Sequence, residues 1–164
     1  MTAGMEHGAV SPRGSRSRSR IALWAWTLLA LLLVQNILGI YLNLFVALPP
    51  SHDLGSLVAS YAALAVHVLV GFLILGTGGV VLYLSARSRR AALWVPALVA
   101  LASAFLAFST GVEFTVGGQD NLLSFVMEVA FLGVVAGDVL VLYVAGGARA
   151  PDAPDSVPRP SAEE

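Results

Sequence analysis

The sequence lacks cysteine and lysine and contains few charged residues of any kind. The absence of cysteine excludes disulfide bonds, thiolate metal sites and thiol catalysis. Only 12% of the 164 residues are charged, whereas 57% are hydrophobic and the mean hydropathy is +0.82. Soluble domains have about 25% charged and about 45–50% apolar residues. A soluble core in so short a chain cannot bury this excess of apolar surface, so the composition indicates a small integral membrane protein.

Four long apolar stretches predict four membrane-spanning helices. Each reaches the ~20 residues that a helix needs to cross a hydrocarbon layer of ~30 Å. The connections are short, so consecutive helices should run antiparallel. We therefore expect an all-α, up-down-up-down bundle of four transmembrane helices. These helices should cover about 21–48, 57–84, 91–112 and 122–145, with Ser51 or Asp53 capping the second and Asp120 or Asn121 capping the fourth.

The two ends of the chain differ in composition from the apolar part. Residues 1–20 are rich in Arg and Ser, and residues 146–164 are rich in Pro, Ala and Asp. Neither segment has apolar side chains to bury, so we expect two disordered tails around a membrane domain of residues 21–145. The chain uses Arg and no Lys, and it contains few Ile residues. This usage is typical of a GC-rich prokaryotic genome. This composition favours a prokaryotic inner (plasma) membrane.

All basic residues fall on one side of the expected bundle. Positive residues in short loops mark the cytoplasmic side of a membrane protein. The loops expected on the opposite side carry no Arg, and both termini should therefore be cytoplasmic. The Arg residues lie before the first apolar stretch, between the second and the third, and after the fourth: Arg13, Arg16, Arg18, Arg20, Arg87, Arg89, Arg90, Arg149 and Arg159.

Polar side chains within the apolar stretches are the candidate functional residues, because such groups are costly in lipid. His67 and Glu128 lie in the same half of two helices that run in the same direction, and we expect them to meet. Their contact would form a proton relay, the wall of a polar ligand site, or a structural hydrogen bond between helices. Asn43 and Thr110 would complete this network, and Asn36 or Asn43 would compete for Glu128.

Asp138 lies alone in the other half of the fourth apolar stretch. A carboxyl group at this depth needs a polar cavity, a proton or a basic partner from the nearby Arg-rich loop. The residue is therefore a candidate ion or proton site, and the sequence leaves these alternatives open.

Small and polar residues recur together on single helix faces at the helical period. Small residues let helix backbones approach closely, so we expect these faces to form the inside of one bundle, with Gly39, Gly71 and Gly78 as helix-packing positions. The motif Gly133-x-x-x-Gly137 favours packing within the chain over a seam between two chains. The four faces are Asn36, Gly39 and Asn43; Ser60, His67, Gly71 and Gly78; Ala100, Ser103, Ala107 and Thr110; and Asn121, Ser124 and Glu128.

No P-loop, nucleophile elbow, HExxH motif or dinucleotide fingerprint occurs, so we assign no catalytic or metal-binding residue. The Arg-Ser segment favours lipid head groups over nucleic acid as its partner. Three functions stay open. The first is an accessory or structural membrane protein, in a homo-oligomer or a larger complex. The second is a small proton-coupled transporter that uses His67, Glu128 and Asp138.

The third is a redox subunit that binds haem or quinone. Membrane haems usually take two axial His ligands, and only one His lies within the apolar stretches. No cofactor is therefore predicted, and haem is the least favoured alternative.

Reporter fusions test the topology. We expect fusions after Arg20, Arg89 and Arg149 all to report a cytoplasmic location, because the Arg residues of one side retain their loops in the cytoplasm. A periplasmic signal at Arg149 would contradict the model of four membrane passes.

Overall fold

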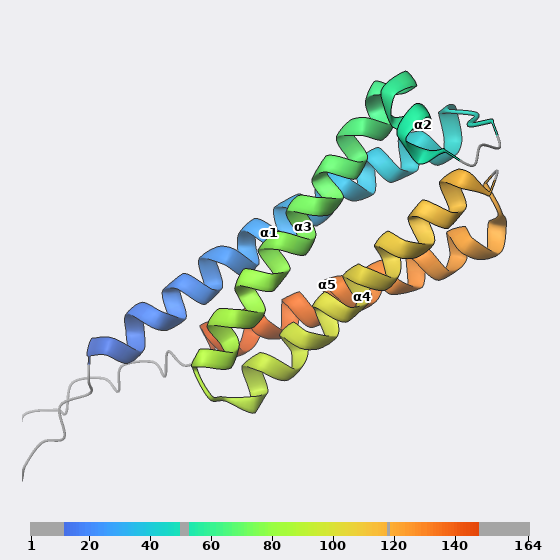
Figure 1. Ribbon diagram of the computed structural model, residues 1–164. Helices are drawn as coiled ribbons and strands as arrows, with labels where there is room; N and C mark the ends of the chain where they lie inside the picture. Colours follow the sequence, from blue (N-terminus) through green and yellow to red (C-terminus); the bar gives the residue numbers. More distant parts are fainter. Residues whose placement is uncertain (1–11, 50–52, 118, 148–164) are drawn as a thin grey trace, which may run out of the picture.

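The computed structural model describes residues 12–49, 53–117 and 119–147, and these ranges form helices without any strand. The helices are α1 (Pro12–Phe45), α2 (Leu54–Ser60), α3 (Ala62–Arg87), α4 (Ala91–Val116) and α5 (Asn121–Gly146) (Figure 1). All except α2 are long and apolar enough to span a membrane. The expected all-α bundle with four candidate membrane-spanning helices is confirmed.

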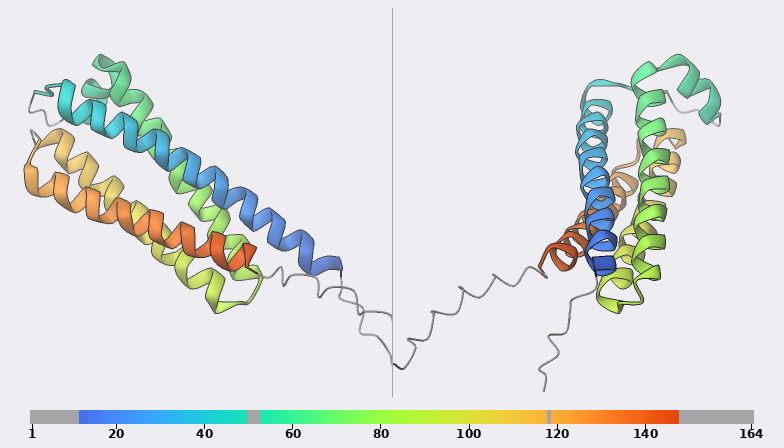
Figure 2. Two further views of the ribbon diagram at one scale, coloured as in Figure 1. Left: turned by 180° about the vertical axis from the view of Figure 1, so that it is seen from behind. Right: turned by 90° about the vertical axis from the view of Figure 1, so that its left-hand side faces the viewer.

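The four long helices form a closed ring. Helix α3 packs between α1 and α4, and α5 packs between α4 and α1 (Figure 2). Consecutive long helices run antiparallel, so helices of the same direction lie across a diagonal. Within the described ranges, no Cα atom of α3 lies within 8 Å of α5, and none of α1 lies within 8 Å of α4. The backbones of two helices that run in the same direction are therefore not neighbours in this bundle.

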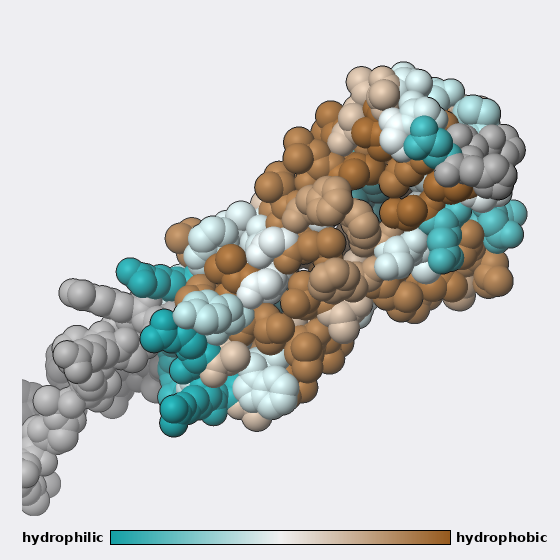
Figure 3. All heavy atoms as spheres, viewed as in Figure 1, coloured by the Kyte–Doolittle hydropathy of each residue, from teal (hydrophilic) through white to brown (hydrophobic). Residues whose placement is uncertain are grey.

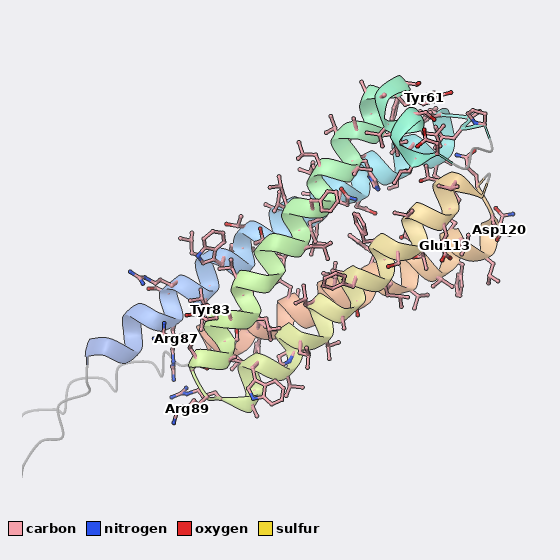
Figure 4. All side chains as sticks on the ribbon, in the orientation of Figure 1. Tyr61, Tyr83, Arg87, Arg89, Glu113 and Asp120 are labelled. Atoms are coloured by element: carbon pink, nitrogen blue, oxygen red, sulfur yellow. The ribbon has the colours of Figure 1, made fainter. Side chains whose placement is uncertain are left out.

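Charged residues mark the two ends of the bundle, and a band of hydrophobic residues separates them (Figure 3). The basic end is where α1 begins and α3 turns into α4, and it carries Arg18, Arg20, Arg87, Arg89 and Arg90. The acidic end lies opposite and carries Asp53, Glu113 and Asp120 (Figure 4). Between the ends, many large apolar side chains point outward, as expected for contact with lipid; Leu44, Phe125 and Tyr143 are more than 60% exposed.

Helix α1 begins earlier than expected. It starts at Pro12 rather than near Ile21, so residues 12–20 are helical instead of forming part of a disordered tail. Proline suits the first position of a helix, and Arg is a good helix former, so nothing in this segment stops the helix from extending beyond the apolar stretch. The remaining parts of the two expected tails, residues 1–11 and 148–164, lie outside the described residues.

The second apolar stretch forms two helices instead of one. Tyr61 has an extended backbone, with φ −120° and ψ 101°, and it separates the short α2 from α3. This break folds Leu57 of α2 back over the acidic end, where it packs in a small cluster with Leu42, Leu48 and Leu64. Asp53 caps α2, because its carboxylate accepts a hydrogen bond of 2.9 Å from the Gly55 N–H. Asp53 is thus one of the two capping residues expected here.

The connection between α4 and α5 is short and carries the second expected cap. Helix α4 continues to Val116, four residues beyond its expected end. Asp120 caps α5 by accepting hydrogen bonds from the N–H groups of Leu122 and Leu123, at 2.6 and 3.3 Å. Just before it, Gln119 has a left-handed backbone with φ 67°. Its side-chain amide donates a hydrogen bond of 3.1 Å to the Val46 carbonyl and so joins the α4–α5 turn to the end of α1.

The glycines of the GxxxG motif lie against α4. A β-carbon added at Gly137 would stand 2.7 Å from the Pro96 carbonyl oxygen and 2.9 Å from Cβ of Ala100. One added at Gly133 would stand 2.6 Å from the hydroxyl of Ser103. Both distances are shorter than a real β-carbon tolerates, so the motif serves close packing of α4 and α5 within the chain.

The small-residue face expected on the second apolar stretch is interrupted by the break at Tyr61. Ser60 falls in α2 and is exposed, so it does not belong to the inside of the bundle. Gly71 and Gly78 are both buried on α3. A β-carbon added at Gly78 would stand 3.3 Å from Cδ1 of Leu101 on α4. Gly78 therefore lies against the flexible end of a leucine side chain, which is a looser contact than the backbone approach at Gly137.

Replacing Gly137 should separate α4 from α5. We expect Gly137→Ala to lower the free energy of unfolding by ~1–3 kcal/mol, because the new methyl group meets backbone atoms of α4 that cannot move aside. Thermal or SDS-induced unfolding of the purified protein measures this loss. Gly76→Ala is the matched control, since nothing lies within 4 Å of a β-carbon there. Equal stability of the two variants would contradict the close packing.

Candidate functional site

A cavity of about 70 Å³ lies between the α1/α3 pair and the α4/α5 pair, toward the acidic end. The space-filling view shows the surface hollowed between these pairs (Figure 3). None of the described residues that line it is Asp, Glu, Arg or Lys. Most are apolar, and the polar ones are Asn43, His67, Thr115 and Gln119. The cavity is therefore an uncharged, largely apolar site with a few hydrogen-bonding groups.

Glycines from three helices form part of the cavity wall: Gly39 of α1, Gly71 of α3 and Gly111 of α4. Here an added β-carbon would stand 3.4 Å from His67, Phe108 and Met127, respectively, which is tight but not a backbone clash. The absent side chains allow those three residues to lie across the neighbouring helices. The α4–α5 contact at Gly111 thus involves the end of a flexible Met side chain, in contrast to the backbone contact at Gly137.

His67 pairs with α1 through a residue that the sequence analysis did not include in the site. The side-chain amide nitrogen of Gln35 lies 3.0 Å from Nε2 of His67. Because α1 and α3 are consecutive long helices, their side chains meet within the bundle. One signal was present in the sequence: Gln35 lies one turn before Gly39 on the same face of α1. Because α1 and α3 are neighbours in the bundle, this face of α1 can meet His67.

Two polar atoms of this pair are left without a partner. Nδ1 of His67 and the side-chain oxygen of Gln35 are buried and make no hydrogen bond. The donor and acceptor roles in the Gln35–His67 contact depend on the His tautomer and on the orientation of the amide. In either assignment one buried donor and one buried acceptor remain, which costs stability. The pair is therefore a polar interhelical contact with unused hydrogen-bonding capacity.

The expected contact between His67 and Glu128 is wrong. His67 belongs to α3 and Glu128 to α5, and these helices lie across the diagonal of the ring. Glu128 is exposed on α5 and does not line the cavity. Nε2 of His67 contacts Gln35 instead, and Nδ1 has no hydrogen-bond partner.

The expected inward face of α5 is also wrong. Asn121 and Glu128 are exposed, and Ser124 is half-buried. The interior face of this helix is instead more apolar and lies nearer the basic end. Its buried members are Ala130, Val134, Gly137, Asp138, Val141 and Ala145.

Asp138 is completely buried in the half of the bundle near the basic end. Neither carboxylate oxygen makes a hydrogen bond to a described residue. Both α3 and α5 begin at the acidic end, and Asp138 lies roughly three turns farther from that end than His67 does. Asp138 does not line the cavity. Of the alternatives left open for Asp138, pairing with an Arg residue is not seen in the described part of the chain. Asp138 therefore stands apart from the other candidate residues.

The remaining candidates divide between the cavity and the helices themselves. Asn43 lines the cavity and is exposed, so it lies at the cavity mouth. Thr110 is buried, but its hydroxyl donates to the carbonyls of Leu106 and Ala107 in its own helix. Asn36 is half-buried and does not line the cavity. Of the six candidates, the structure brings His67 and Asn43 together at one cavity.

The described residues contain no group of three or more His, Cys, Asp or Glu side chains arranged to hold a metal ion. Comparison with protein-family models, with curated proteins and with solved structures finds no match for this chain.

A double-mutant cycle tests the Gln35–His67 contact. We expect a coupling energy of about 0.6 kcal/mol, and no more than about 1.7 kcal/mol, as for polar contacts between membrane helices. The cycle compares the unfolding free energies of Gln35→Leu, His67→Phe and the double variant with that of the wild type. A coupling energy of zero would mean that the two side chains do not interact.

Proposed function

We propose that this protein is an accessory subunit of a membrane complex, and that it binds its partner through the exposed face of α5 around Glu128. The observation that carries this proposal is the position of that carboxylate. Glu128 lies two turns into an apolar helix and points away from the bundle interior. Its surroundings are large apolar side chains that are themselves more than half exposed: Leu122, Phe125, Val129 and Leu132.

A carboxylate on a lipid-facing surface is unfavourable. Insertion scales assign an acidic residue at a helix centre a cost of ~2.5–3.5 kcal/mol, and less toward the interface. Glu128 makes no hydrogen bond or ion pair with a described residue that would offset this cost. A partner helix with a cation or hydrogen-bond donor at the same depth would offset it. Ionisable residues in such positions usually mark a functional contact.

The distribution of Arg favours a different protein as the partner over a second copy. All nine basic residues lie before the apolar part of α1, between α3 and α4, or after α5. A second copy in the same orientation has no Arg or Lys at the depth of Glu128. The proposal therefore commits to a transmembrane helix of another chain with Arg or Lys near the acidic end of the bundle.

We further propose that the basic end faces the cytoplasm of a prokaryotic cell, with the protein in the inner membrane. The support is the one-sided Arg distribution together with the ring of four antiparallel long helices. In this orientation Glu128 lies in the half of the membrane that faces away from the cytoplasm.

The geometry gives less support to the two alternatives. A proton-coupled carrier needs its polar groups along one path, whereas His67, Glu128 and Asp138 lie apart. A redox subunit needs room for a ring system, and the cavity of about 70 Å³ is smaller than the ~150 Å³ that binds benzene in a protein core.

A model transmembrane helix tests the α5 docking surface. The probe is a polyleucine helix that carries one Arg. When the probe crosses the membrane beside the protein, this Arg lies two turns below the acidic end of the bundle, at the depth of Glu128. We expect it to bind the wild-type protein in lipid bilayers about five- to thirtyfold more tightly than an all-Leu helix, as for ~1–2 kcal/mol of polar interaction between helices. Energy transfer between labelled protein and labelled probe measures the binding.

Two variants complete this experiment. Glu128→Leu should abolish the preference for the Arg helix, because it removes the carboxylate. Glu113→Leu should preserve it, since Glu113 is an exposed carboxylate at the acidic end of a different helix. Equal binding of the two probes by the wild type, or an unchanged preference in Glu128→Leu, would refute the docking surface.

A further inference from the structure

We propose that the cavity between the helix pairs binds one uncharged, straight-chain amphiphile with a hydroxyl head group, such as a short-chain alcohol. The head group would lie at Asn43 and the chain between the α1/α3 and α4/α5 pairs. This site is separate from the α5 docking surface, and the two proposals can fail independently.

The size of the cavity favours a chain over a ring. A volume of about 70 Å³ is roughly half of the ~150 Å³ that accommodates benzene. A linear hydrocarbon has a smaller cross-section than an aromatic ring, so a short chain whose head group stays at Asn43 can enter a space that is too narrow for a ring. Met127 in the wall is unbranched and flexible, so the wall can adapt to a chain.

The chemistry of the wall favours an uncharged and mainly apolar ligand. The described lining residues include no acidic or basic side chain apart from the His67 imidazole, so they offer no counter-charge for an ionic head group. Leu42, Leu64, Val68 and Phe108 supply apolar contacts for a hydrocarbon. Burying a chain against them is favourable, at ~0.8 kcal/mol for each CH₂ group removed from water, and less when the chain comes from lipid.

Asn43 determines where the polar head lies. It is exposed, it lines the cavity, and its amide makes no hydrogen bond with a described residue. An amide offers both a donor and an acceptor, and a hydroxyl group can bond to either. At two residues from the end of α1, Asn43 also lies at the level where the hydroxyl of a membrane-dissolved alcohol is found, close to the membrane surface.

The glycines of the wall provide a way to close the site without removing a polar group. A methyl group at Gly39 or Gly111 would stand 3.4 Å from His67 or from the sulfur of Met127 and would occupy cavity space. Alanine is also the better helix former, so these variants should fold. Gly79→Ala is the matched control, because nothing lies within 4 Å of a β-carbon at that position of α3.

Photolabelling of the full chain in lipid nanodiscs tests the proposal. The probe is a butanol that carries a photoactivatable diazirine, and mass spectrometry locates the attached label. We expect label on the residues that line the cavity. It should fall at least about fivefold in Gly39→Ala and in Gly111→Ala, since even one extra methyl group overpacks so small a space. Labelling of Gly79→Ala should equal that of the wild type.

A diazirine-bearing butane without the hydroxyl group distinguishes a site from simple partitioning into an apolar space. It should label the cavity more weakly than the alcohol in the wild type, and equally in Asn43→Leu. Thermal unfolding verifies that each variant is folded. The proposal is overturned if the cavity is unlabelled, as expected for a cavity that holds water only. It is also overturned if the alkane labels the wild type as strongly as the alcohol, or if neither Gly variant reduces the label.

Discussion

The packing of α4 against α5 at Gly133 and Gly137 is the contact on which the shape of the bundle depends. At Gly137 the two backbones come so close that a single methyl group would overlap the Pro96 carbonyl. Inside a membrane, such close packing takes the place of the hydrophobic driving force of soluble proteins. The contact is confined to the half near the basic end. Toward the acidic end the glycines face side chains instead of backbone, the helix pairs separate, and the cavity lies between them.

Most of the architecture could be predicted from the sequence, because hydropathy and turn chemistry are local properties. The lengths of the apolar stretches predict the spans, and Asp53 and Asp120 indicate where helices begin. The break at Tyr61 could not be predicted, since the apolar stretch continues through it. It depends on a tertiary contact, the packing of Leu57 over the bundle end. The early start of α1 could not be predicted, because a polar segment rich in Arg and Ser is compatible with either helix or coil.

The candidate site was only partly predictable, because helical periodicity assigns residues to a face but does not say which helix that face meets. His67 was correctly identified as a polar group within the bundle, but its partner is Gln35 and not Glu128. The ring order alone would have excluded the latter pairing, since helices two steps apart in an up-down bundle lie on a diagonal. The inward face of α5 was wrongly assigned for a different reason. Near the acidic end the residue of α5 that lines the cavity is Met127, and the polar Asn121 and Glu128 are exposed on other faces of the helix.

The hydrogen bond from Gln119 to Val46 has a mechanical consequence. The cavity separates the α1/α3 pair from the α4/α5 pair toward the acidic end, and this bond joins the two pairs there. A hydrogen bond across that gap holds the two pairs together where their packing is least close. The left-handed backbone of Gln119 is a conformation that glycine would adopt at lower cost, by ~1–2 kcal/mol. The side-chain amide of Gln119 reaches Val46 just after α1, so the strained backbone at this position accompanies a hydrogen bond that links the two helix pairs.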